Sequence, residues 1–265
     1  MAKVAVDKQG AITIVAIDRF KEARNAVDPE TAVLLRDAFF AFDADASQSV
    51  AILTGRGGTF CAGYDLKVAA GRDPDEASAR ALRNVEGPGP MGPTRHLLSK
   101  PVIAAVEGYA VAGGLELALW CDMRVASESA KFGVFCRRFG VPLVDGGTVR
   151  LPRLIGESRA MDLILTGCAV GADEALALGL ANRVVAEGEA LGAALQLARQ
   201  IAAFPQQCLR NDRLSARRQH GAATLRDALA QEFTLGRATL ASGEAEGGAR
   251  RFVAGAGKHG RFEPS

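Results

Sequence analysis

Cysteine is scarce in this chain, and its few cysteines are not spaced to form pairs. Five are present among 265 residues, and none belongs to a C-x-x-C motif. An odd number of widely separated cysteines predicts neither a disulfide framework nor a zinc site. We therefore expect reduced thiols and no bound metal; the cysteines are Cys61, Cys121, Cys136, Cys168 and Cys208.

Long apolar runs are also missing. No stretch reaches the roughly 18 consecutive apolar residues that a membrane-spanning helix requires. The first residues, MAKVAVDKQGAITIVAID, alternate like a strand and lack the apolar centre of a signal peptide. Lysine and arginine are scattered and the net charge is only +2, so no nucleic-acid surface is indicated. We expect a cytoplasmic protein that binds neither membranes nor nucleic acids.

Four short runs rich in valine and isoleucine are the expected strands: residues 11–17, 49–55, 101–108 and 123–127. A helix is expected after Asp28, a plausible N-cap, with Pro29 at its first position and apolar residues returning every three to four positions. This alternation of strand and helix predicts an α/β fold.

From about residue 157 the strand signal fades and helical patterns dominate. We expect an α/β core over residues 1–200 and a helical region over 201–265 that serves oligomerisation. The segment 71–95 is rich in glycine, proline and charge and is too long for an ordinary connection. It is either a mobile binding loop or a disordered surface insertion.

Two glycine-bearing turns follow expected strands. In PVIAAVEGYAVAGGLELALW (101–120), Gly113 and Gly114 would begin a helix, where unpaired N–H groups and the helix dipole favour an anion such as a thioester oxyanion. In GRGGTFCAGYDL (55–66), the Gly63–Tyr64 peptide could supply a second N–H group to the same oxygen. Alternatively, the glycines only permit tight turns, and Glu116 only complements the helix dipole.

A different interpretation uses the same residues. Gly108, Ala110 and Gly113 approximate a dinucleotide-binding fingerprint, with Glu128 as a ribose ligand. Alanine at the middle position, and a location past residue 100 instead of in a leading βαβ unit, argue against a nicotinamide-dependent oxidoreductase.

Four motifs together resemble the enoyl-CoA hydratase/isomerase (crotonase) superfamily. They are GRGGTFCAGYDL, KPVIAAVEGYAVAGGLELALWCDMRVASESAKFG, LPRLIGESRAMDLILTG and ADEALALGLANRVV. The resemblance implies an α/β fold built as a crotonase-like spiral of ββα units with a helical C-terminal trimerisation region. It also implies an acyl-CoA thioester substrate, a homotrimer or dimer of trimers, and no metal or redox cofactor.

The resemblance further implies the residues of the site. The backbone N–H groups of Tyr64 and Gly113 correspond to the oxyanion hole, and Glu116 to one of the two catalytic glutamates of hydratases. The implied contacts to coenzyme A are Glu22, Ala23, Arg24, Ala62, Asp65, Leu66, Lys258 and Phe262.

The chain departs from the hydratase pattern at Cys136, which stands where the second glutamate is expected. A thiol cannot simply replace a carboxylate, because its reference pKa is about 8.5 and it is a poor hydrogen-bond partner. Asp145 lies where some members of the superfamily place a catalytic aspartate, and it could restore a carboxylate pair with Glu116. Alternatively, Asp145 caps the helix that follows.

The neighbours of Cys136 leave further alternatives open. Arg137 and Arg138 could lower the pKa of the Cys136 thiol or bind an acidic acyl group, or they could be a solvated or intersubunit pair. His96, His220 and His259 show no triad spacing, so we expect surface or structural roles for them.

The expected activity is reversible hydration of a 2-enoyl-CoA through an enolate held in an oxyanion hole. The alternatives are enoyl- or dienoyl-CoA isomerisation, another one-carboxylate reaction such as decarboxylation or thioester hydrolysis, or acyl-CoA binding with little catalysis.

Overall fold

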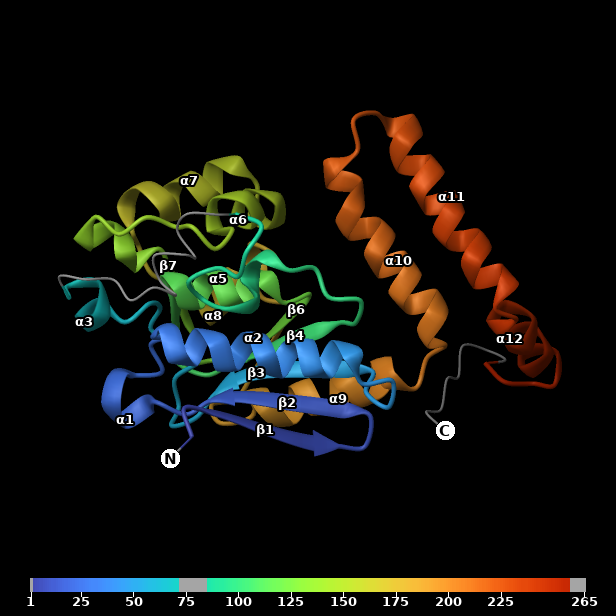
Figure 1. The fold of residues 1–265 in the computed structure, drawn as a ribbon, viewed down its shortest axis with the longest axis horizontal. Coiled ribbons are helices and arrows are strands. Elements are labelled where there is room, and N and C mark those ends of the chain that lie inside the picture. The colour runs from blue at the N-terminus through green and yellow to red at the C-terminus, as the bar shows by residue number, and fades with distance from the viewer. Residues whose placement is uncertain (1, 72–84, 258–265) are drawn as a thin grey trace.

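The computed structural model describes residues 2–71 and 85–257, and its main sheet has six strands (Figure 1). The order is β1-β2-β3-β4-β6-β9, with β1 antiparallel to β2 and the other pairs parallel. All four expected strands are confirmed. The bounds are β1 Val4–Gln9, β2 Ile12–Ile17, β3 Val50–Gly55, β4 Val102–Val106, β6 Met123–Ser127 and β9 Arg183–Val185.

A smaller sheet is formed by the short second strands of the repeating strand–strand–helix units. Its order is β5 (Tyr109–Val111), β7 (Lys131–Gly133) and β8 (Val170–Gly171). Isolated bridges that pair Cys61 with Ala110 and Val27 with Tyr64 continue the same arrangement towards the N-terminus. Strand, short strand and helix thus repeat along the chain, which confirms the expected spiral of ββα units.

The prediction that strands fade after residue 157 was incomplete. Both β8 and β9 lie beyond that point. They contain two and three residues, and segments this short show no measurable periodicity.

Helices cover both faces of the main sheet. Strand β4 is buried throughout and β3 at every residue except the last, Gly55, as expected for parallel strands covered on both sides. Helix α9 packs against one face, and the larger apolar cluster, which includes α2 and α5, lies on the other. The helices of the core are α1 Phe20–Ala23, α2 Pro29–Ala44, α3 Leu66–Ala69, α5 Gly113–Trp120, α6 Gly147–Ile155, α7 Glu157–Thr166, α8 Ala172–Ala177 and α9 Ala190–Ala202.

The expected start of α2 is confirmed. The Asp28 side chain accepts a hydrogen bond of 2.8 Å from the backbone N–H of Thr31, and Pro29 is the first helical residue. The cap satisfies one of the four N–H groups that lack an acceptor within the helix.

The last three helices stand to one side of the core in Figure 1 and form an arm. They are α10 (Gln206–Arg218), α11 (Leu225–Ala241) and α12 (Glu244–Val253). Arg213 and Arg217 of α10 each lie 2.8 Å from the Asp122 carboxylate of the core. Within the described residues, no helix has the length and apolar character needed to cross a membrane.

A close backbone approach fixes how α5 sits against the segment before α3. A Cβ atom added to Gly114 would lie 2.1 Å from the carbonyl oxygen of Cys61, a distance that no side chain can occupy. Cys61 N–H donates to the Tyr109 carbonyl (2.8 Å), and Val111 N–H donates to the Cys61 carbonyl (3.1 Å). Glycine at 114 is therefore required for two neighbouring turns of the spiral to touch.

We expect Gly114→Ala to destabilise the fold by at least about 1–3 kcal/mol, the usual cost of overpacking. Gly236→Ala is the control, because a Cβ at that position of α11 meets no atom within 4 Å. That variant should gain about 0.5–1 kcal/mol from helix propensity. Urea unfolding of both variants measures the difference, and equal stabilities would contradict the close approach.

Candidate active site

A cavity of about 410 Å³ lies at the N-terminus of α5, where it meets residues 62–71, 90–91 and 135–145. Its wall is mostly apolar, with two carboxylates. Seven residues expected at the site line it: Ala62, Tyr64, Leu66, Gly113, Glu116, Cys136 and Asp145. The structure therefore brings together residues separated by up to 83 positions in the sequence.

Two backbone peptides face each other at one end of this cavity. The Gly63 carbonyl accepts a hydrogen bond of 2.8 Å from the N–H of Val27. Because the N–H and C=O of a trans peptide point in opposite directions, the N–H of Tyr64 is directed away from Val27. A Cβ added to Gly63 would lie 3.1 Å from the backbone nitrogen of Gly113, so the two peptides are in close proximity.

Gly113 is the first residue of α5, and its N–H has no acceptor within the helix. The preceding residue, Ala112, has φ 54° and ψ −125°, a conformation that is costly for any residue with a Cβ atom. A hydrogen bond of 2.9 Å from Ala112 N–H to the Gly133 carbonyl holds this turn. The strained backbone of Ala112 fixes the direction of the Gly113 peptide at the N-terminus of α5.

Glu116 is 2% exposed and lies one helical turn below Gly113. Its Oε1 accepts hydrogen bonds from the backbone N–H groups of Asp145 and Gly147, both at 2.8 Å. Burial, reinforced by the negative charge of Asp145, raises the pKa of Glu116 to about 7. A carboxyl group tuned to this range can both give and accept a proton near neutral pH.

Asp145 is also 2% exposed, and its role as a helix cap is wrong. Helix α6 begins after Gly146 and has no side-chain cap. Oδ1 of Asp145 instead accepts hydrogen bonds from the Met91 N–H (3.1 Å) and from the Thr94 hydroxyl. Burial raises the pKa of Asp145, while these two donors and nearby arginines oppose the shift.

Cys136 lies in the 3₁₀ helix η2 (Phe135–Phe139) and is 6% exposed in the same cavity. Burial and the Glu116 charge raise the pKa of the Cys136 thiol; the positive charge of Arg137 acts in the opposite direction, as one alternative supposed, but does not outweigh them. Those arginines do not line the cavity. Arg137 donates to the Ile164 carbonyl at 3.0 Å, and Arg138 donates to the Gly167 carbonyl and lies 4.2 Å from the centre of the Phe135 ring.

The expected coenzyme A contacts fall into three groups. Ala62 and Leu66 line the cavity, and the Arg24 carbonyl accepts a hydrogen bond of 3.2 Å from Ala62, which places the end of α1 beside it. Arg24 and Glu22 are exposed and Ala23 is half-buried. Lys258 and Phe262 lie outside the described residues.

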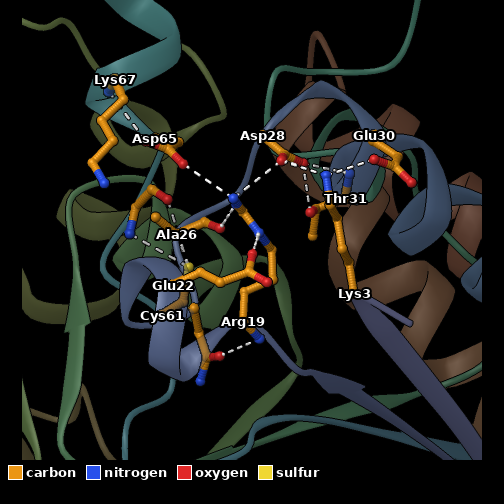
Figure 2. Close-up of polar contacts among 12 residues, drawn as sticks. Lys3, Arg19, Glu22, Ala26, Asp28, Glu30, Thr31, Cys61, Asp65 and Lys67 are labelled. Carbon is orange, nitrogen blue, oxygen red and sulfur yellow. Dashed lines mark hydrogen bonds and ion pairs between the residues drawn. The ribbon is translucent and has the colours of Figure 1, made fainter. Parts of the chain in front are cut away.

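Asp65 was expected to contact coenzyme A, but it does not line the cavity. Its carboxylate lies 3.2 Å from Nη2 of Arg19 and accepts from the Lys67 N–H at 3.1 Å, as the cap of α3 (Figure 2). The side chain is 7% exposed and is directed to Arg19.

Several cavity residues were not anticipated individually. The segment 71–95 was expected to be either a binding loop or a surface insertion, and its described ends line the cavity at Gly71, Pro90 and Met91. Residues 72–84 lie outside the described part. The rest of the apolar wall comes from Val68 and Ala112 and from the stretch around Cys136: Phe135, Phe139, Val141, Pro142 and Val144.

Neither described histidine, His96 or His220, lines the 410 Å³ cavity. The His96 carbonyl accepts from the Trp120 indole at 2.8 Å, and its ring packs edge-on against Phe40. His220 is exposed, and His259 lies outside the described residues. Within residues 2–71 and 85–257, no cluster of three histidine, cysteine or acidic side chains could hold a metal ion.

The dinucleotide-binding interpretation does not fit the topology. Strand β5 of the smaller sheet lies between Gly108 and α5. The fingerprint instead requires the helix to follow its strand directly through the glycine turn.

Comparison with known proteins shows the family of the chain. A family model described as enoyl-CoA hydratase/isomerase matches residues 7–257. An enoyl-CoA hydratase of Mycobacterium tuberculosis is 41% identical over 205 residues, which cover 75% of this chain and 74% of that protein. A carnitinyl-CoA dehydratase of Salmonella paratyphi A is 39% identical over 197 residues, 73% and 72% of the two chains.

Solved structures show the same relationship. The crystal structure of an enoyl-CoA hydratase from Mycobacterium marinum superimposes with a TM-score of 0.85 at 40% identity, over 95% of this chain and 96% of that one. One from Mycobacterium tuberculosis gives 0.85 at 37% identity over 99% of each. With its ββα spiral, its paired backbone N–H groups and its buried glutamate, the chain belongs to the enoyl-CoA hydratase/isomerase (crotonase) family.

Proposed function

We propose that this protein catalyses the reversible hydration of a 2-enoyl-CoA thioester. The observation that carries the proposal is the convergence of the Tyr64 and Gly113 peptides with Glu116 and Asp145 around one cavity. Relatives named enoyl-CoA hydratase and carnitinyl-CoA dehydratase support an addition or removal of water. Coenzyme A would lie near Glu22, Ala23, Arg24, Ala62 and Leu66, and the reaction would need no metal or redox cofactor.

The oxyanion hole supplies the largest part of the proposed catalysis. The N–H groups of Tyr64 and Gly113 donate to the thioester oxygen and stabilise the charge that it acquires as the enolate forms. Because both donors are held by the backbone, they need no reorganisation during the reaction.

The carboxylate pair moves the protons. The water oxygen bonds to the β-carbon and its proton passes to Asp145, while the electron pair of the double bond moves towards the thioester oxygen. The α-carbon then takes a proton from Glu116, and a proton returns from Asp145 to Glu116 for the next cycle. Oε1 of Glu116 is occupied by two N–H donors, so the transferable proton resides on Oε2.

The protonation states follow from the two environments. Burial raises the pKa of Asp145, while the hydrogen bonds that it accepts from Thr94 and Met91 oppose this shift and favour its ionised form. That negative charge disfavours ionisation of Glu116. The active form holds one proton, on Glu116, so hydration kcat/KM should fall as the pH rises through about 7 and Glu116 loses that proton.

We expect Asp145→Asn to lower the pKa of Glu116, because the variant removes a negative charge that raises it. Infrared titration of the Glu116 carboxyl band, assigned by its loss in Glu116→Gln, measures the shift without requiring turnover. Asp37→Asn is the control, since Asp37 is an exposed carboxylate on α2. An unchanged Glu116 titration in Asp145→Asn would contradict the proposed coupling.

The reaction itself is tested with crotonyl-CoA, whose thioester absorbance falls on hydration. Glu116→Gln should lower kcat by at least about 10²-fold, because it removes the group that transfers the proton. Cys136→Glu reports on the missing second glutamate. If the wild type hydrates crotonyl-CoA, Asp145 supplies the second carboxylate.

Other outcomes identify the alternatives. Hydration gained only in Cys136→Glu would point to isomerisation or another one-carboxylate reaction in the natural protein. Tight binding of CoA thioesters without turnover of enoyl-CoA substrates would point to an acyl-CoA-binding protein.

We also propose a homotrimer or dimer of trimers, located in the cytoplasm. Helix α11 carries apolar side chains on one face, at spacings of four residues, and they are exposed in the single chain: Leu225 (76%), Leu229 (53%) and Phe233 (67%). An exposed apolar stripe of this kind favours association with a second copy.

Phe233→Glu should shift the protein towards monomers, because a charge would be buried in the subunit contact. Gln231→Glu is the matched control, since it adds the same charge on the opposite side of α11. Light scattering with size-exclusion chromatography gives the mass of each, and a wild type that elutes as a monomer would refute the assembly.

A further inference from the structure

A buried arginine joins three segments next to the oxyanion hole. Arg19 is 8% exposed and follows strand β2. Its Nη2 atom lies 3.1 Å from Asp28 and 3.2 Å from Asp65, and Nη1 donates to the Ala26 carbonyl at 2.5 Å (Figure 2). A buried charge is tolerated only when it is paired in this way.

Arg19 contacts an exposed carboxylate, Glu22, at 3.6 Å, and two buried carboxylates, Asp28 and Asp65, that are themselves fixed at helix starts. Asp28 caps α2 through the Thr31 N–H, and Asp65 caps α3 through the Lys67 N–H. The guanidinium group is planar and donates in several fixed directions, which suits it to span two carboxylates and a carbonyl. Arg19 therefore sets the distance between the first residues of two helices.

Two backbone hydrogen bonds that orient the Gly63–Tyr64 peptide lie between the residues that Arg19 contacts. Val27 N–H donates to the Gly63 carbonyl (2.8 Å), and Asp65 N–H donates to the Val27 carbonyl (2.9 Å). Arg19 holds the residues on both sides of Val27 and also the residue that follows Tyr64. Any displacement of these contacts would rotate the Gly63–Tyr64 peptide.

We propose that Arg19 is a positioning residue that directs the Tyr64 N–H at the thioester oxygen of the substrate. It acts through Asp28 and Asp65 and does not touch the substrate itself. The inference rests on the proposed function to the extent that it takes a CoA thioester to lie in the cavity.

The test uses butanoyl-CoA labelled with ¹³C at its carbonyl, a saturated thioester that cannot be hydrated. Hydrogen bonds from the oxyanion hole should lower the carbonyl stretching frequency on binding to the wild type. In Arg19→Met most of this shift should be lost. With crotonyl-CoA, kcat should fall by about 10²-fold, as for loss of one oxyanion-hole donor, while KM changes little.

Matched variants separate positioning from stability. Arg19→Lys should recover part of the band shift, because it keeps the charge. Lys3→Met should retain the wild-type band and kcat, because Lys3 contacts Asp28 at 2.7 Å but the Arg19–Asp65 contact remains. If Arg19→Met fails to fold, Asp65→Asn tests the positioning role instead. The asparagine oxygen can still cap α3, but the charge that pairs with Arg19 is lost. The carbonyl band shift should therefore be smaller than in the wild type.

The outcomes that overturn the inference are distinct from those that overturn the reaction. A folded Arg19→Met protein, or an Asp65→Asn protein, with the wild-type band shift and kcat would show that Arg19 only stabilises the fold. A wild type that shifts the butanoyl-CoA band but hydrates no enoyl-CoA would refute the proposed hydration. In that case the band shifts of the variants would still test the positioning role.

Discussion

The rest of the site depends on the close contact between two neighbouring turns of the backbone spiral. Gly114 passes so near the Cys61 carbonyl that a side chain has no room, and a Cβ added to Gly63 would lie 3.1 Å from the backbone nitrogen of Gly113. These contacts bring two peptide groups from separate turns to the edge of one cavity. Because backbone hydrogen bonds from Val27 to Gly63 and from Ala112 to Gly133 hold the two peptides, their N–H groups are oriented before any ligand arrives, which is the condition for strong electrostatic stabilisation.

The same contact places a carboxyl group in a nearly dry environment. Glu116 projects from the first turn of α5 and is buried beside Asp145, so its proton is held more tightly than in water. Arg150 secures the partner loop by donating to the carbonyls of Asp145 (2.8 Å) and Thr94 (2.5 Å). The loop that carries Asp145 is thus held through backbone carbonyls, and the Asp145 carboxylate is not used for that contact.

Cys136 shows how the chain differs from a two-glutamate hydratase. It lies in the same cavity as Glu116, but as a buried thiol with a raised pKa it adds an apolar surface and no charge. In the proposed mechanism the second carboxylate comes from Asp145, which precedes α6. A carboxylate entering from a different loop would approach the substrate from a different direction, and this would influence which carbon receives the proton.

Local sequence signals determined much of this protein. The four apolar runs are strands, and the Asp28–Pro29 pair starts a helix, because these features depend on residues a few positions apart. The family motifs contain five of the seven expected site residues that line the cavity, and positions counted between the motifs gave Cys136 and Asp145. What they could not determine is where a polar side chain finds its partner across the fold.

Tertiary structure decided those partners. Asp145 bonds to Thr94, 51 positions away, instead of capping α6, and Asp65 turns to Arg19, 46 positions away. Strands β8 and β9 are too short to show a pattern and exist only because neighbouring strands pair with them. Burial determines whether a polar side chain contacts solvent, caps a nearby helix or pairs with a distant ion. Burial, in turn, is set only when the turns of the spiral have packed.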